Sequence, residues 1–343
     1  MYEGKLHIHI ENSRISHQVF IGTGEQVKAL LDKNPDLAGK LHITIGSSAD
    51  DPIDLWTEED LKEYYDYMKT ADVLVGYSFP TEGMASYAPN LRWIHFISSG
   101  VEHLSPFGWV PPGVHLVNNR GVHLPKSGES FAMFLAMLNA RIPRLVTSQH
   151  NAKWDRIFTS VIVGKKLVVF GAGSQGGELA RQAKRMGLYV VGIDPYVTEH
   201  PHCDEVHTAA GLKEDLRDAD FLAIAAPVTE ETRGFFGEEV LGWLPPHAGL
   251  MNVSRGALLD QKTLERKLRA EELSCAILDV TDPEPLPADS PLWTTPNLII
   301  TPHVSSDDLV NYMPLTLALT IENVRNEMAG RPLKNVVDVA REF

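Results

Sequence analysis

Three charged side chains in the last third of the sequence have the types needed for acid–base chemistry on a carboxylic acid. Arg255 and His303 each follow a short apolar run, and Glu284 lies in a loop framed by Pro283 and Pro285. An arginine can hold a carboxylate with two hydrogen bonds and polarise a neighbouring carbonyl. An imidazole can transfer a proton, and a nearby glutamate orients the ring and favours its charged form. We call these three residues the Arg–Glu–His trio. The alternative for Arg255 is a structural ion pair with a carboxylate of the protein itself.

A glycine-rich segment predicts the cofactor. Residues 167–170 are all apolar and lead into Gly171, Gly173 and Gly176, and Asp194 follows eighteen positions after the last of these glycines. Gly171 permits a tight turn after a buried strand, and Gly173 lets the backbone approach a phosphate. Gly176 lets a helix pack closely on that strand. The order of strand, turn, helix, second strand and carboxylate is the dinucleotide-binding pattern.

The same segment predicts which dinucleotide is bound. Ser174 and Gln175 begin the helix, whose first amides and positive dipole end attract a pyrophosphate. Asp194 can accept hydrogen bonds from both ribose hydroxyls, and its charge would repel a 2′-phosphate. No lysine or arginine occupies positions 195–197, so no basic side chain offsets that repulsion. We therefore expect NAD as the cofactor, with NADH preferred over NADPH.

A turn near residue 100 has the composition of a carboxylate-binding loop. Ser99, Gly100 and Val101 follow the predicted strand 91–97. Small residues after a strand expose backbone N–H groups that suit an anion. Together with the cofactor and the Arg–Glu–His trio, this turn predicts hydride transfer to a 2-oxo acid. In that reaction the arginine would clamp the substrate, the histidine would donate the proton and the glutamate would support the imidazolium.

Two α/β series are expected to position these residues. The first alternates predicted strands with predicted helices, over residues 6–10, 41–45, 73–75 and 91–97 for strands and 25–31 and 58–68 for helices. Thr57 is a predicted N-cap for the helix 58–68. A second series begins at Lys166, and a strongly apolar helix is predicted between the two, over residues 125–144. Such an alternating order indicates parallel sheets.

Bulk composition narrows the class of protein. A chain of 343 residues is long for one core, so two domains are expected, and a net charge of −14 argues against nucleic acid or an anionic membrane as partner. The two cysteines, Cys203 and Cys275, suit a reducing cytoplasm, and no apolar run approaches the length of a membrane span. None of the 14 histidines has a metal-binding spacing, and His200 and His202 are expected in a surface loop without metal.

From about Asp72 onward the sequence resembles the D-isomer-specific 2-hydroxyacid dehydrogenase family. Besides the dinucleotide segment, the matching blocks are Ser99-Gly100-Val101, Trp154, Ala226-Pro227-Val228-Thr229, Asn252-Val253-Ser254-Arg255-Gly256-Ala257, Leu278-Asp279-Val280, Glu284-Pro285-Leu286-Pro287, Ser290-Pro291-Leu292-Trp293 and Thr301-Pro302-His303. The resemblance implies an oxidoreductase that interconverts 2-oxo acids and D-2-hydroxy acids. It also implies a doubly wound NAD-binding domain, residues 120–308, inserted into a flavodoxin-like substrate domain, residues 1–119 and 309–343.

The resemblance also implies roles for single residues. The backbone of Ser99, Gly100 and Val101 would hold the carboxylate together with the arginine of the trio, whose histidine and glutamate would be the acid/base and its partner. Asp279 would contact the nicotinamide amide, and Pro227 would lie along the cofactor. Homodimers would form mainly through the NAD-binding domain, including the predicted helix 125–144.

Other functions on the same scaffold remain open. An NAD(H)-sensing protein similar to the family's corepressors would keep the trio, and so would a phosphite-oxidising enzyme. A formate dehydrogenase would carry glutamine in place of Glu284, so that residue argues against it. The aromatic loop 76–80, where the family meets the substrate side chain, does not indicate one particular 2-oxo acid.

Overall fold

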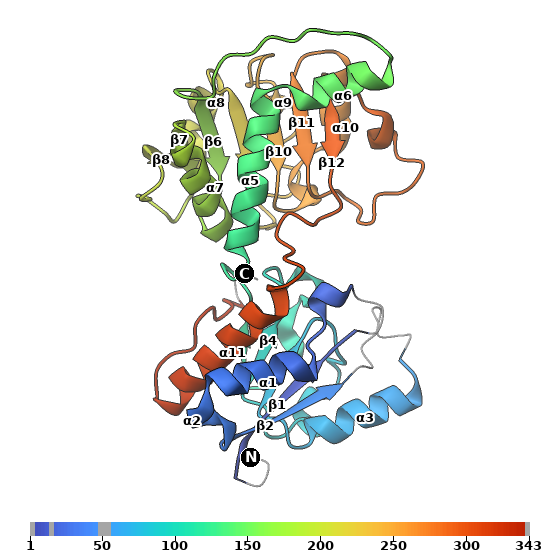
Figure 1. The fold of residues 1–343 in the computed structure, drawn as a ribbon, viewed down its shortest axis with the longest axis vertical. Coiled ribbons are helices and arrows are strands. Elements are labelled where there is room, and N and C mark those ends of the chain that lie inside the picture. The colour runs from blue at the N-terminus through green and yellow to red at the C-terminus, as the bar shows by residue number, and fades with distance from the viewer. Residues whose placement is uncertain (1–3, 14–16, 47–55, 340–343) are drawn as a thin grey trace. The chain divides into compact units, whose positions relative to one another are not determined.

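The structure, a computed structural model, describes residues 4–13, 17–46 and 56–339 (Figure 1). The chain forms two compact units, and the first of them is discontinuous in sequence. Unit 1 comprises residues 1–123 and 307–343, and unit 2 comprises residues 124–306.

Unit 1 contains a five-stranded parallel sheet. Its strands are β1 (Leu6–Glu11), β2 (Leu41–Gly46), β3 (Val73–Gly76), β4 (Trp93–Phe96) and β5 (His115–Val117), in the order β2-β1-β3-β4-β5. All four pairings are parallel. This strand order is that of flavodoxin-like folds, in which ligands bind at the carboxyl ends of the strands. The expected flavodoxin-like fold is confirmed for this unit.

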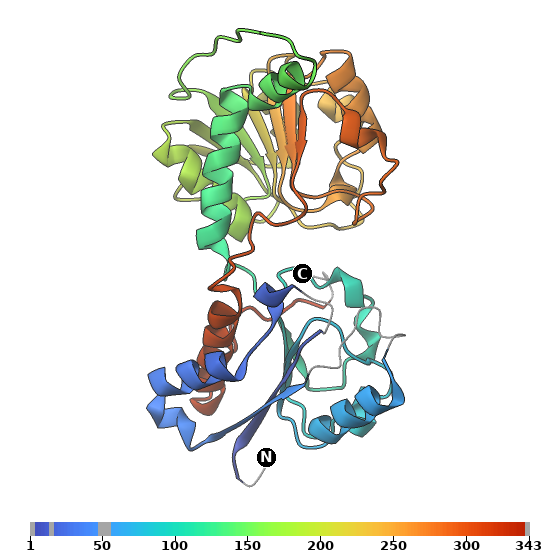
Figure 2. The ribbon, with the colours of Figure 1, turned by 45° about the vertical axis from the view of Figure 1, so that its right-hand side comes forward.

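Helices cover both faces of that sheet (Figure 2). On one face lie α1 (Gly24–Lys33), α2 (Pro35–Ala38) and α11 (Tyr312–Met328), which pack on the apolar side chains of β1. On the other face lie α3 (Glu58–Met68) and α4 (Met84–Tyr87). Short 3₁₀ turns occupy Gln18–Phe20, Glu102–Leu104 and Phe107–Trp109. Thr57 caps α3 as predicted, because its side chain accepts the amide of Asp60.

Unit 2 contains a seven-stranded parallel sheet. Its strands are β6 (Lys166–Phe170), β7 (Tyr189–Ile193), β8 (Glu205–His207), β9 (Phe221–Ile224), β10 (Gly249–Asn252), β11 (Cys275–Leu278) and β12 (Leu298–Ile300), in the order β12-β11-β10-β9-β6-β7-β8. The chain reverses direction across the sheet between β6 and β9, which are neighbours. That reversal is the switch point of a doubly wound sheet, and the expected Rossmann-like fold is confirmed.

Helices again cover both faces of the second sheet. One face packs against α5 (Leu124–Asn139) and α7 (Ser174–Arg185), and the other against α8 (Leu212–Leu216), α9 (Glu238–Leu241) and α10 (Gln261–Arg269). The 3₁₀ turns are Ala209–Gly211, Gly256–Leu258 and Pro291–Thr294. None of the helices in the described ranges combines the length and apolar character needed to cross a bilayer.

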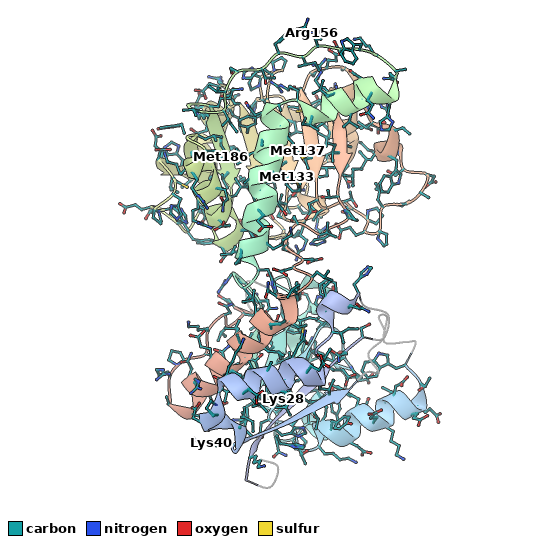
Figure 3. All side chains as sticks on the ribbon, in the orientation of Figure 1. Lys28, Lys40, Met133, Met137, Arg156 and Met186 are labelled. Atoms are coloured by element: carbon teal, nitrogen blue, oxygen red, sulfur yellow. The ribbon has the colours of Figure 1, made fainter. Side chains whose placement is uncertain are left out.

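The predicted single helix over 125–144 is wrong. The structure has α5 and then a separate helix, α6 (Ile142–His150), and the break lies at Arg141, which has a left-handed φ of 58°. Pro143 explains the break, because proline lacks an N–H and its ring prevents the preceding helix from continuing. The remaining apolar stretch is α5, on which Figure 3 labels Met133 and Met137.

Candidate active site

The dinucleotide segment adopts the conformation that its glycines predict. Gly171 follows β6 with a φ of +96°, and a Cβ there would lie 2.6 Å from the backbone N of Ala226. A Cβ on Gly176 would lie 1.7 Å from the carbonyl oxygen of Gly171, so no side chain fits between the helix and the turn. These two glycines therefore hold α7 directly against the end of β6.

Gly173 has a different environment. It caps α7 in an extended conformation, and a Cβ there would meet no atom within 4 Å. Ser174 and Gln175 are the first residues of α7, and the Gln175 Oε1 atom is buried without a hydrogen-bond partner among the described residues. An open space in front of a long helix's first amides, with an unpaired polar atom beside it, fits the pyrophosphate of a dinucleotide.

Asp194 lies where the second strand of the pattern ends. Its carboxylate accepts hydrogen bonds from the amide of Ala172 at 2.9 Å and from the amides of Tyr196 and Val197 at 2.8 and 3.0 Å. Three amide donors fix the position of the carboxylate beside the turn that begins at Gly171. Its partly exposed oxygens can still accept ribose hydroxyls, as the sequence predicts.

Two members of the Arg–Glu–His trio are hydrogen-bonded to each other. Glu284 Oε2 lies 2.9 Å from His303 Nδ1, and Glu284 Oε1 accepts the amide of Thr281 at 2.9 Å. His303 follows β12 and has a left-handed φ of 53°. Because Nδ1 is bonded to the carboxylate, the other ring nitrogen, Nε2, is the atom left to exchange a proton with a substrate.

Electrostatics favour a charged imidazole in this pair. The hydrogen bond that His303 donates to Glu284 raises the pKa of His303 above its usual value, although burial and the nearby charge of Arg255 oppose that rise. Burial acts to raise the pKa of Glu284, but its hydrogen bonds to His303 and to the Thr281 amide outweigh burial, so the carboxyl pKa is lowered. Both shifts therefore favour an imidazolium held by a carboxylate.

Arg255 is brought to the same end of the sheet by the strand before it. It follows β10, and its Nη1 donates to the carbonyl of Ser254 at 2.7 Å, while Asn252 Nδ2 donates to the Arg255 carbonyl at 2.8 Å. The next residue, Gly256, passes so close to the chain that a Cβ would lie 2.0 Å from the carbonyl carbon of Thr281. This close approach keeps the arginine beside the loop that carries the glutamate.

Asp279 has a structural role that the sequence did not indicate. It is buried at the end of β11, and its carboxylate accepts the Thr301 hydroxyl at 2.6 Å and the amides of Val304 and Ser305, both at 3.2 Å. Its own carbonyl accepts the amide of His303 at 2.8 Å. The carboxylate thus organises the turn that presents the histidine, whatever else it contacts.

The predicted carboxylate-binding residues belong to unit 1. Ser99, Gly100 and Val101 follow β4, and we call residues 98–101 the anion turn. Among the residues that the structure describes, none accepts a hydrogen bond from the amides of these three residues. Unit 2 contains the trio, Asp279 and the turn at Gly171–Gly176. Pro227, which follows β9 in the same unit, is exposed.

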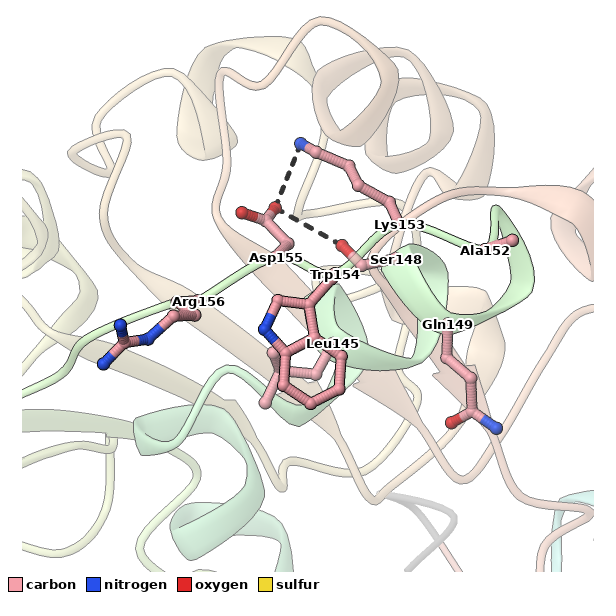
Figure 4. A pocket seen from close by; sticks show the side chains of 8 residues that line it. All are labelled: Leu145, Ser148, Gln149, Ala152, Lys153, Trp154, Asp155 and Arg156. Atoms are coloured by element: carbon pink, nitrogen blue, oxygen red, sulfur yellow. Dashed lines mark hydrogen bonds and ion pairs between the residues drawn. The ribbon is translucent and has the colours of Figure 1, made fainter.

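The other candidate sites are of two kinds, a metal site and a surface hollow. No group of three or more potential metal ligands occurs among the described residues. A shallow hollow on unit 2 contains none of the predicted site residues, and Figure 4 shows Trp154 on its wall and Asp155 Oδ2 bonded to Lys153 and Ser148 at 3.2 and 3.4 Å. The contacts that sequence reasoning missed are those between the Asp279 carboxylate and the residues around His303.

Comparison with known proteins identifies relatives of this chain. Residues 131–305 match the family described as "D-isomer specific 2-hydroxyacid dehydrogenase, NAD binding domain". The D-3-phosphoglycerate dehydrogenase of Methanocaldococcus jannaschii is 31% identical over 291 residues, which cover 82% of this chain and 54% of that protein. The chain therefore spans about half the length of that relative. The glyoxylate reductase of Korarchaeum cryptofilum is 30% identical over 268 residues, covering 74% of this chain and 80% of that one.

A solved structure extends the similarity to the whole fold. The D-isomer specific 2-hydroxyacid dehydrogenase of Xanthobacter autotrophicus, in complex with NADPH and MES, has a TM-score of 0.79 at 24% identity, covering 99% of this chain and 100% of that one. The sequence matches and the two parallel sheets lead to one assignment. The chain belongs to the D-isomer specific 2-hydroxyacid dehydrogenase family.

Proposed function

We propose that the protein catalyses the NAD-dependent reduction of a 2-oxo acid to the D-2-hydroxy acid, and the reverse reaction. The observation that carries this proposal is the hydrogen-bonded pair of Glu284 and His303, placed with Arg255 in the same unit as the dinucleotide turn. The family match supports the same reaction class, and both curated relatives described above carry the names of dehydrogenases or reductases of this kind.

In the proposed reaction each member of the trio has one task. NADH, when bound, supplies the hydride to the carbonyl carbon. Arg255 holds the substrate's carboxylate and stabilises charge on the carbonyl oxygen. His303 donates the proton that the oxygen needs as it becomes a hydroxyl, and Glu284 keeps the imidazole charged and oriented until then. In unit 1, the backbone amides of the anion turn are a further proposed binding place for a carboxylate.

The test is a panel of 2-oxo acids assayed for NADH oxidation, using glyoxylate, hydroxypyruvate and phenylpyruvate. His303→Asn should remove most turnover and leave NADH binding intact, because the ring touches the substrate's oxygen and not the dinucleotide turn. His247→Asn is a matched control, since His247 is exposed and precedes β10 at the opposite edge of the sheet. Tight NADH binding without turnover of any 2-oxo acid would reject the proposal in favour of an NAD(H) sensor.

We also propose that NADH is preferred over NADPH. Asp194 is a charged acceptor held by three backbone amides, and no basic side chain stands at positions 195–197 to receive a 2′-phosphate. The Xanthobacter structure holds NADPH, but at its level of identity it informs on the fold alone. The ratio of kcat/KM for the two coenzymes measures this preference, and a ratio in favour of NADPH would refute it.

A homodimer is the proposed assembly, in the cytoplasm. Unit 2 exposes several large apolar side chains, namely Met133 on α5 and Trp154, Phe158, Val161 and Val163 on the segment after α6, and Trp154 is 93% exposed. Contact with another chain would remove such side chains from water. Both cysteines are free thiols, which suits a reducing compartment. Sedimentation of the purified protein as a monomer at micromolar concentration would contradict the dimer.

A further inference from the structure

Every carbonyl of the anion turn up to Gly100 is tied to the protein. Ser98 O accepts the backbone amide of Asn119 at 2.9 Å. Ser99 O accepts Asn118 Nδ2, also at 2.9 Å. Gly100 O accepts the hydroxyl of Ser98 at 2.6 Å. The turn therefore has three successive carbonyls with fixed directions: two are held by residues directly after β5, and the third is held by a hydroxyl of the turn itself.

The direction of a carbonyl determines the direction of the next amide. In a trans peptide the C=O of one residue and the N–H of the following residue point in opposite directions across a rigid plane. Cis bonds occur in the described residues only before prolines, so the planes of the anion turn are trans. Fixing the carbonyls of residues 98 and 99 towards Asn119 and Asn118 therefore turns the amides of Ser99 and Gly100 away from those residues. Fixing the Gly100 carbonyl towards the Ser98 hydroxyl likewise turns the Val101 amide away from that hydroxyl.

We propose that Asn118 and Ser98 are positioning residues, which aim the amides of Gly100 and Val101 at the substrate's carboxylate. This inference rests on the proposed function of the anion turn and adds the side chains that make it work. Neither side chain needs to touch the substrate, because each acts through the carbonyl that it holds. The outward amides otherwise have no acceptor among the described residues, and a carboxylate provides several lone pairs for them.

The surroundings of Asn118 fix the orientation of its amide group. The residue is only 3% exposed, and its Oδ1 accepts the amide of Arg120 at 3.2 Å. With the oxygen so engaged, the nitrogen must face Ser99 O. Rotation of the amide group by half a turn would place an N–H against an N–H and an oxygen against a carbonyl.

The base of the turn is held equally firmly. Ile97 O accepts two donors, Asn119 Nδ2 at 2.7 Å and the Tyr312 hydroxyl at 2.8 Å. Tyr312 also stacks on His123, with ring centroids 3.8 Å apart. Burial lowers the pKa of His123 to about 4, so this ring is neutral and adds no charge that would compete for an anion. The anion turn is therefore a rigid platform before any substrate arrives, which reduces the entropy lost on binding.

The test compares two neutral truncations with matched controls in the same unit. Ser98→Ala removes the donor to Gly100 O, and Asn118→Ala removes the donor to Ser99 O. Ser86→Ala, on exposed α4, is the serine control. Asn90→Ala is the asparagine control, because Asn90 Nδ2 donates to the carbonyl of Lys69 at 3.0 Å in the same way. Oxalate binding by calorimetry, glyoxylate kinetics and hydrogen exchange of a peptide covering residues 97–104 are measured for all four.

Each truncation at the turn should weaken oxalate binding and raise the KM for glyoxylate about two- to tenfold, the effect of one net hydrogen bond. The kcat value should change little, because the amides hold the carboxylate equally in the substrate and the transition state. Hydrogen exchange in the turn should accelerate, and both controls should match the wild type.

Three results would overturn the proposal. These are a wild type that does not bind oxalate, oxalate affinities equal in all variants, and weakened binding with unchanged exchange in the turn. A wild type that binds oxalate but reduces no 2-oxo acid would reject the proposed function instead. In that case oxalate affinity and hydrogen exchange still decide between support and refutation, since neither depends on turnover.

Discussion

Replacing Gly173 with alanine should separate cofactor binding from folding. Gly173 has φ −73° and ψ −156°, an extended conformation that alanine adopts without strain, and the added Cβ would meet no protein atom within 4 Å. The folded apoprotein should therefore accept the methyl group. If the space is where the pyrophosphate approaches the backbone, the same methyl group will push the phosphates away from the first amides of α7.

The effects of Gly173→Ala on folding and on cofactor binding can both be estimated. Alanine is a poorer N-cap than glycine, which destabilises the folded protein by about 1 kcal/mol. Alanine also restricts the unfolded chain, which stabilises the folded protein by about 0.4–1 kcal/mol, so the net change in the free energy of unfolding is small. For binding, a hydrogen bond to a charged phosphate contributes about 1.5–3 kcal/mol. Losing one such bond raises the Kd for NADH about tenfold or more, and losing two raises it about a hundredfold or more.

Gly237→Ala is the matched control. Gly237 also caps a helix of unit 2, with φ −94° and ψ −163°, and its Cβ would lie at an ordinary 3.6 Å from the nearest atom, Gly234 O. Both variants share the capping and unfolded-state terms, so only the cofactor distinguishes them. NADH fluorescence titration and thermal unfolding of the apoprotein are the measurements. Wild-type affinity for NADH in Gly173→Ala would refute the placement of the pyrophosphate.

The remaining predictions concern unit 2. Glu284→Gln removes the main cause of the raised pKa of His303, so the imidazole loses its proton at lower pH and the alkaline limb of the reduction profile should move to lower pH; an unmoved limb would exclude the pairing. Asp279→Asn replaces an acceptor of three hydrogen bonds by a group with one oxygen. It should lower the free energy of unfolding by about 1–3 kcal/mol and reduce kcat, and denaturant unfolding that matches the wild type would contradict this. Arg255→Lys keeps the charge but loses the two-pronged geometry, so kcat/KM should fall about tenfold or more, and an unchanged value would argue against a carboxylate clamp.

Much of the fold could be predicted because the signals are local. Parallel strands that are buried on both faces are short continuous apolar runs, as in residues 167–170. Each glycine that follows this run is required for one steric reason, which the sequence pattern predicts. The contacts at Gly171 and Gly176 match that prediction. The break at Arg141 was also visible in principle, since Pro143 lies inside the predicted helix, but the strongly apolar pattern of α5 obscured it.

The trio could be predicted as a set of residue types, because each member follows a strand and parallel strands place their carboxyl ends at one edge. Their interactions could not be predicted in the same way. The distance between Glu284 and His303 depends on a loop framed by prolines, whose path has no periodic pattern. The anion turn is a similar case, because two of its carbonyls are held by residues about twenty positions further along the chain.

His303 shows why the finer geometry of this site is a property of the tertiary structure. Its left-handed φ of 53° is unfavourable for a residue with a Cβ, so local preference would move the ring elsewhere. The turn persists because Asp279 accepts the Thr301 hydroxyl and two amides beyond the histidine, and a buried carboxylate without those donors would be far more costly. The acid and the strained turn therefore stabilise each other across more than twenty residues of sequence. A substitution at Asp279 must then change the direction of the imidazole as well as its charge, and a substitution at Glu284 changes mainly the charge.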